Sequence, residues 1–157
     1  MFKRLPVVLL FLVLASLVSL SGCASVKQYV NLPDQNTALE DLHKARIYVM
    51  RPAVFGSAIP MTVKDNGMLI GKTGPHSFLC WEREPGITVL TGEAENSSQL
   101  ELAVEEGMTY YVCQHVRMGF FIARNKLEEV TREKGISILE QCKPPFVIAN
   151  DNISQKE

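Results

Sequence analysis

The 157-residue sequence lacks the short motifs that mark the familiar classes of enzyme. It contains no Gly-x-Ser-x-Gly, His-Glu-x-x-His or Ser-x-x-Lys, and no phosphate-binding loop of the spacing Gly-x-x-x-x-Gly-Lys-Ser/Thr. Its glutamate pairs, Glu105-Glu106 and Glu128-Glu129, are adjacent, so on a strand the two members of each pair point to opposite faces. Neither pair is therefore arranged as an acid and a base acting on one substrate. We predict a protein without catalytic activity.

Positive charge is not in excess. The chain has 16 Lys+Arg against 17 Asp+Glu, and removal of residues 1–22 with Lys3 and Arg4 would leave 14 against 17, a net charge of −3. Nucleic-acid-binding domains carry a basic excess, so we expect no nucleic-acid partner. A Cys-x-x-Cys pair is also missing, which argues against a thioredoxin-like or zinc-ribbon site. The sequence indicates neither a metal nor another cofactor.

Only one apolar run is long. Residues 6–20 carry no charge, but these 15 residues fall short of the roughly 20 that a membrane-spanning helix needs. Lys3 and Arg4 precede the run, and the small residues Ser21 and Gly22 follow it. A basic start, an apolar middle and small residues at the end are typical of a secretory signal. The sequence predicts a signal peptide over residues 1–22.

Leu20-Ser21-Gly22-Cys23 resembles the bacterial lipobox, in which a leucine and two small residues precede a lipidated cysteine. The resemblance implies a diacylglycerol on the Cys23 sulfur, cleavage before Cys23 and acylation, as with palmitate, of the new amine. Ala24 stands where an Asp would favour retention in the inner membrane, which implies an outer-membrane lipoprotein facing the periplasm. The alternatives are surface display and an uncleaved anchor helix with an incidental cysteine.

Lipidation of Cys23 would leave three cysteines, Cys80, Cys113 and Cys142. The bacterial periplasm is oxidising and permits a disulfide, but an odd number leaves one thiol over. We expect a Cys80–Cys142 bridge, because Cys80 falls in a predicted strand and Cys142 at the end of a predicted helix that would pack on the sheet. A Cys80–Cys113 bridge and three buried free thiols remain as alternatives.

The residues after the cysteine divide into three parts. Residues 23–44 are polar and interrupted by Pro33, which predicts a flexible lipidated tether. Residues 144–157 begin with two prolines and become polar, which predicts a flexible tail. Between them, residues 45–143 predict one mainly β domain.

That domain is predicted from short runs rich in β-branched, aromatic or alternating residues, separated by Gly, Pro and Asn turns. Asp65-Asn66-Gly67 is a typical tight-hairpin sequence. The number and spacing of the runs favour an antiparallel β-sandwich or small barrel of about seven to eight strands, followed by a short C-terminal helix. The expected strands are 46–51, 59–64, 68–72, 77–82, 87–95, 100–104, 108–116 and 126–131, and the helix lies within 132–143.

Several blocks in this region resemble an uncharacterised periplasmic domain of bacterial lipoproteins, known only as a domain of unknown function. They are ARIYVMRP at 45–52, CWEREPG at 80–86, EGMTYYV at 106–112 and QHVRMG at 114–119, followed by Ala123-Arg124. The resemblance covers residues 45 to 143 and depends on the order of the blocks. It implies a β-rich periplasmic lipoprotein and brings no known activity.

Two groups of residues are candidates for a site. Cys113 and His115 are two apart in a predicted strand and so share a face, as a metal pair or a thiol–base pair would; the other interpretation is a buried structural cysteine. Met118, Phe120 and Phe121 surround Gly119 without alternation. If exposed, they form a patch for a partner or a membrane; if buried, they close one end of the core.

We therefore expect a lipid-anchored periplasmic module that binds an envelope protein or assists envelope assembly. Its membrane partner would be reached through lipid on Cys23. The alternative is a small periplasmic enzyme or metal binder that uses Cys113 and His115. Loss of a protein partner on changing Phe120 or Phe121 would favour the first function, and loss of activity or metal on Cys113→Ala would favour the second.

Overall fold

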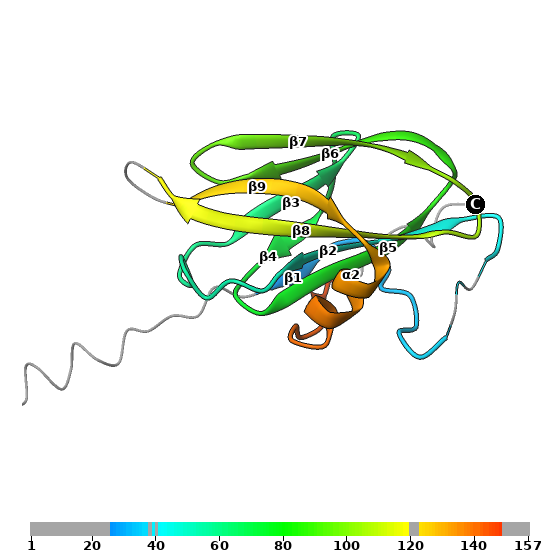
Figure 1. Ribbon diagram of the computed structural model, residues 1–157, viewed down its shortest axis with the longest axis horizontal. Helices are drawn as coiled ribbons and strands as arrows, with labels where there is room; N and C mark the ends of the chain where they lie inside the picture. The colour runs from blue at the N-terminus through cyan, green and yellow to red at the C-terminus, as the bar shows by residue number, and fades with distance from the viewer. Residues whose placement is uncertain (1–25, 38, 40, 120–122, 149–157) are drawn as a thin grey trace, which may run out of the picture.

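The predicted runs form strands close to their expected bounds in the computed structural model, which describes residues 26–37, 39, 41–119 and 123–148 (Figure 1). The strands are β1 Lys27–Gln28, β2 Ala45–Arg51, β3 Met61–Asp65, β4 Met68–Thr73, β5 Ser77–Arg83, β6 Gly86–Glu93, β7 Ser97–Val104, β8 Thr109–Met118, β9 Ala123–Val130 and β10 Phe146–Val147. Helix α2, Arg132–Leu139, follows β9. The expected β class and short C-terminal helix are confirmed.

The strands form two sheets, with the orders β10-β1-β4-β3-β6-β7 and β5-β2-β8-β9. Figure 1 shows the two sheets as stacked layers, so the sandwich prediction is confirmed, and the described residues form no closed barrel. Most neighbours are antiparallel, as expected. Two pairs are parallel, β2 with β8 and β1 with β10, so both sheets are mixed. The sequence does not distinguish parallel from antiparallel pairs, because apolar and polar residues alternate in the same way in both kinds of strand.

The main core lies between the sheets. Ile47 and Val49 of β2 meet Val63, Ile70 and Leu90 of the facing sheet. Burying such side chains contributes about 1.5–3 kcal/mol each, which makes this layer the main source of stability. Successive side chains in a strand alternate between faces, so the intervening residues of β2 point away from this core.

A second apolar layer lies on the outer face of the four-stranded sheet. Tyr48 and Met50 of β2 pack there with Phe78, Cys80 and Tyr111, and the C-terminal part of α2 covers them. Both faces of β2 are therefore covered, which explains why all seven of its residues are buried. A strand covered on both faces reads as a continuous apolar run, and Ile-Tyr-Val-Met is such a run.

Residues 23–44 and 144–157 are not wholly flexible, and these two predictions need correction. Lys27 and Gln28 form β1, which pairs with β4 on one side and with β10 on the other. Gln28 is fully buried; its Nε2 donates to the Cys80 carbonyl oxygen at 2.6 Å, and its Oε1 accepts from the Cys80 amide at 3.0 Å. This side chain joins β1 of one sheet to β5 of the other. The folded body therefore extends beyond 45–143 at both ends.

Candidate functional site

The residues that would carry the anchor, including Cys23 and the predicted signal peptide, lie outside the described residues. The described chain begins at Val26, and β1 begins four residues after Cys23. Across residues 26–37, 39, 41–119 and 123–148, no helix has the length and apolar character needed to cross a membrane.

Cys80, Cys113 and Cys142 are all free thiols in this structure, so the expected Cys80–Cys142 disulfide is not formed. The sequence placed the two residues correctly in one respect, because both belong to the apolar layer beneath α2. Burial raises the pKa of Cys80 and of Cys142 to about 11 in each case, and burial also raises the pKa of Cys113. A thiolate is the reactive form of cysteine, so these three side chains are weak nucleophiles at neutral pH.

Cys113 and His115 share one face of β8, as predicted. The Cys113 Sγ lies 4.0 Å from the His115 Nδ1, and the His115 Nε2 lies 3.5 Å from a carboxylate oxygen of Glu128. Within the described part of the chain, no group of three or more His, Cys, Asp and Glu side chains is placed to hold a metal ion. The Cys113–His115 pair by itself offers two donors, whereas catalytic zinc sites use three protein ligands.

A hollow of about 410 Å³ lies on the outer face of the four-stranded sheet. Tyr48 of β2 and Tyr111 of β8 line it, and their rings stack with centroids 5.4 Å apart and planes 5° from parallel. Gln35 and Leu42 line one side, and Arg132 of α2 lines the other. We call this hollow the tyrosine pocket. Flat aromatic rings and leucine present apolar area, and a guanidinium at the side recognises carboxylate or phosphate.

The wall of the tyrosine pocket is fixed by a buried arginine. Arg46 forms an ion pair with Glu82, whose Oε1 lies 2.7 Å from the Arg46 Nη2. The Arg46 Nη1 donates to the carbonyl oxygens of Asp34 at 3.2 Å and Thr37 at 3.0 Å. Because the charge of Arg46 is engaged in these contacts, Arg46 holds residues 34–37 against the sheet instead of facing a ligand.

Tyr48 and Arg132 complete the chemistry of the tyrosine pocket. The Tyr48 hydroxyl donates to Gln35 Oε1 at 3.0 Å, and burial raises the pKa of Tyr48, so the phenol stays neutral. Arg132 is exposed and makes no ion pair with any other residue that the structure describes. Arg132 is therefore the pocket's available cation.

Sequence reasoning missed this pocket. Its wall comes from a segment that reads as a tether, and its lining comes from elements far apart in the chain. The cluster Arg46, Tyr48 and Tyr111 falls in two β-like runs, but nothing in the sequence shows that β2 and β8 are neighbours. One feature of the sequence does point to the pocket: the continuous apolar run of β2 indicates that other parts of the chain pack on both faces of this strand.

Met118 belongs to an exposed apolar surface at the other end of β8. Its side chain is 79% exposed, and Val54 and Phe55 in the loop of residues 52–60 are 58% and 49% exposed. That loop packs against the β8–β9 pair, because a Cβ on Gly56 would lie 3.1 Å from the Cβ of Ala123, the cross-strand partner of Met118. Of the three residues of the candidate patch, Met118 is exposed, whereas Phe120 and Phe121 lie outside the described residues.

The loop that carries Val54 and Phe55 is held by the fully buried Arg51. The Arg51 guanidinium donates to the carbonyl oxygens of Ile59 at 2.7 Å, Gly56 at 2.8 Å and Phe55 at 3.2 Å. Buried donors and acceptors are costly when unpaired, so these bonds fix the course of the loop. The two apolar side chains are thus presented on an ordered backbone.

Comparison with known proteins finds a relative of low identity. The chain is similar to an uncharacterised protein of Haemophilus influenzae, with 26% identity over 121 residues that cover 74% of this chain and 71% of the relative. No protein-family model matches the chain. The similarity extends over most of both chains, and it brings no activity with it because the relative is uncharacterised.

Proposed function

We propose that this protein is a lipid-anchored lipoprotein of the outer membrane, facing the periplasm, and that it binds an envelope protein without catalysing a reaction. The anchor is supported by the apolar run of residues 6–20, by Leu20-Ser21-Gly22-Cys23 and by Ala24. A binding role is supported by the tyrosine pocket, and the raised pKa values of the three described thiols argue against a cysteine nucleophile.

The tyrosine pocket is the observation that carries the proposal. It combines the stacked Tyr48 and Tyr111 rings with Leu42 and with the cation of Arg132. Aromatic and arginine side chains dominate the energetics of protein interfaces, where an apolar anchor is buried and a polar rim orients it. The partner that fits is a protein segment with an apolar side chain for the tyrosines and a carboxylate for Arg132.

Photocrosslinking in intact cells tests the binding role. A photoreactive amino acid at Leu42, which lines the pocket, should capture a protein partner. The same residue at Gln99, exposed on β7 in the other sheet, is the matched control and should capture none. Arg132→Glu should abolish the Leu42 crosslink while leaving the melting temperature unchanged, because it reverses an exposed charge. Equal capture from both positions, or capture that survives Arg132→Glu, would contradict the proposed site.

A further inference from the structure

The two ends of the sandwich differ in charge. We call one the Met118 end; it comprises the loop of residues 52–60, the turn of residues 74–76, and the paired Met118 and Ala123. Its basic side chains are Lys27, Lys72, Arg117, Arg124 and Lys143. Its acidic side chains, Glu93 and Glu95, are each engaged by a cation, Lys64 at 2.7 Å and Arg124 at 3.9 Å. This end therefore has a basic excess.

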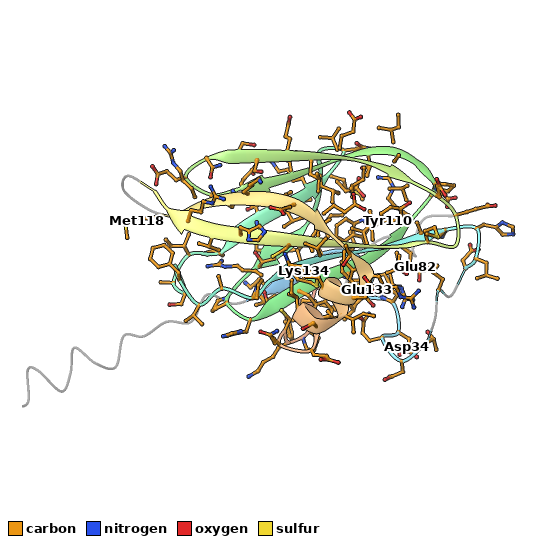
Figure 2. The ribbon with its side chains drawn as sticks, in the orientation of Figure 1. Asp34, Glu82, Tyr110, Met118, Glu133 and Lys134 are labelled. Atoms are coloured by element: carbon orange, nitrogen blue, oxygen red, sulfur yellow. The ribbon has the colours of Figure 1, made fainter. Side chains whose placement is uncertain are left out.

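The opposite end is acidic, and we call it the Glu106 end. The starts of β2 and β8 and the ends of β5 and β7 meet there. Its exposed or half-buried acidic side chains are Asp34, Asp41, Glu82, Glu84, Glu105 and Glu106, and its basic ones are Lys44, Arg83 and Arg132, with His43 beside Glu106. Figure 2 shows Met118 at one end of the molecule, and Asp34, Glu82 and Tyr110 toward the other. The whole chain is nearly neutral, so the separation of charge is a property of the fold.

The apolar side chains at the Met118 end complement its charge. Val54, Phe55 and Met118 are exposed together on a loop and a strand end that pack against each other. Clustered apolar side chains rimmed by cations are typical of surfaces that rest on a bilayer of anionic lipid. Arg51 orders the loop, so little conformational freedom is lost when the surface docks.

Strand β1 also starts at the Met118 end. Lys27 pairs with Lys72, and the residue after Lys72, Thr73, accepts a hydrogen bond at its carbonyl oxygen from Arg51 Nη1 at 3.4 Å. Cys23 precedes Lys27 by four residues, which span at most about 14 Å when fully extended. This step depends on the proposed lipid on Cys23. With that lipid in the bilayer, the start of β1 is confined near the membrane surface.

We propose that the Met118 end docks on the anionic phospholipid surface of the bilayer that holds the Cys23 lipid. Val54, Phe55 and Met118 enter the headgroup region, and the surrounding Lys and Arg side chains face the lipid phosphates. The tyrosine pocket lies toward the starts of β2 and β8, so docking directs it away from the membrane and toward partners. Charge repulsion keeps the Glu106 end off the same surface.

Hydrogen–deuterium exchange on the mature protein, purified in the form that the cell produces, tests the docking. The protein is reconstituted in vesicles of phosphatidylethanolamine and phosphatidylglycerol and compared with the same protein in neutral detergent. We expect amide exchange at residues 53–58 and 116–118 to slow by about tenfold in vesicles, with no change at 84–88 and 105–108. Replacing phosphatidylglycerol with phosphatidylcholine should remove most of the protection, because the phosphate attraction is lost.

A pair of matched double variants isolates the apolar contact. Val54→Ser with Phe55→Ser should abolish protection at 116–118, whereas Met68→Ser with Ile87→Ser, exposed apolar residues of the Glu106 end, should leave it intact. The mass of the N-terminal peptide from the same preparation separates the two proposals. An unmodified Cys23 overturns the anchor and the docking that rests on it. A lipidated Cys23 with equal exchange in vesicles and detergent overturns the docking alone.

Discussion

At the scale of single residues, Gly135 shows how closely α2 approaches the sheet. A Cβ at this position would lie 2.3 Å from the Tyr111 Cγ and 2.5 Å from its Cβ, far inside contact distance. Tyr111 stacks on Tyr48, so it has little room to move. Glycine is unfavourable inside a helix, but at position 135 this loss is offset by the close packing of α2 on Tyr111 that glycine permits. A residue of poor helix propensity is thus the one that allows the helix to pack on Tyr111.

Gly135→Ala should therefore destabilise the protein despite the better helix propensity of alanine. We expect the free energy of unfolding to fall by about 1–3 kcal/mol, the usual cost of overpacking, in urea denaturation followed by circular dichroism. Ser137→Ala, at an exposed position of the same helix, is the matched control and should change stability by less than about 0.5 kcal/mol. A stabilised Gly135→Ala protein would mean that α2 lies farther from Tyr111.

At the scale of elements, the sequence was most informative where alternation is strong. Strands such as β7 and β8 were predicted because Leu100, Leu102 and Val104 alternate with polar residues and residues 108–116 are strongly β-like. The two-residue strands β1 and β10 were missed because two residues carry no periodicity, and Gln28 reads as a surface residue. Contacts between residues far apart in the sequence decide which strands pair, where the tyrosine pocket forms and whether the cysteines bond. The pattern of residues along the chain does not reveal such contacts.

Gln28→Ala should release β1 from the sandwich. The change removes the amide that bonds both the N–H and the C=O of Cys80 and leaves those buried groups unpaired, which costs about 1–3 kcal/mol each. We expect much faster hydrogen exchange at the Tyr29 amide, which donates to the Ile70 carbonyl at 2.9 Å, and little change in β8. Gln99→Ala, which alters an exposed glutamine, serves as the control. Unchanged exchange at Tyr29 would show that backbone pairing alone holds β1.

At the scale of the whole molecule, the start of β1, the Met118 end and the tyrosine pocket follow one another along the strand direction. β2 and β8 run parallel from the tyrosine pocket to the Met118 end, and β1 begins at that same end. The proposed lipid would therefore restrict both the distance and the direction of the domain. This differs from the loose tether of residues 23–44 expected from sequence, because residues 27–28 are part of a sheet.

Cys23→Ser tests the anchor directly. The variant should incorporate no labelled palmitate, keep residues 1–22 and appear as a precursor of higher mass on gel electrophoresis, because its side chain has no sulfur to lipidate. Cys142→Ser, which changes a half-buried cysteine of the folded domain, should label and mature like the unaltered protein. Palmitate retained by Cys23→Ser, or lost by Cys142→Ser, would show that the lipid is attached elsewhere.

The pairing of β1 with β10 also constrains the order in which the strand pairs form. Lys27 lies opposite Phe146, so nearly the whole chain must be synthesised before the outermost pair of the six-stranded sheet can form. Contacts between such distant residues form slowly, because the entropy of closing a long loop is lost before the contacts stabilise the chain. β1 can pair with β4 as soon as residues 68–73 are available, and β10 thus closes the edge of the six-stranded sheet last.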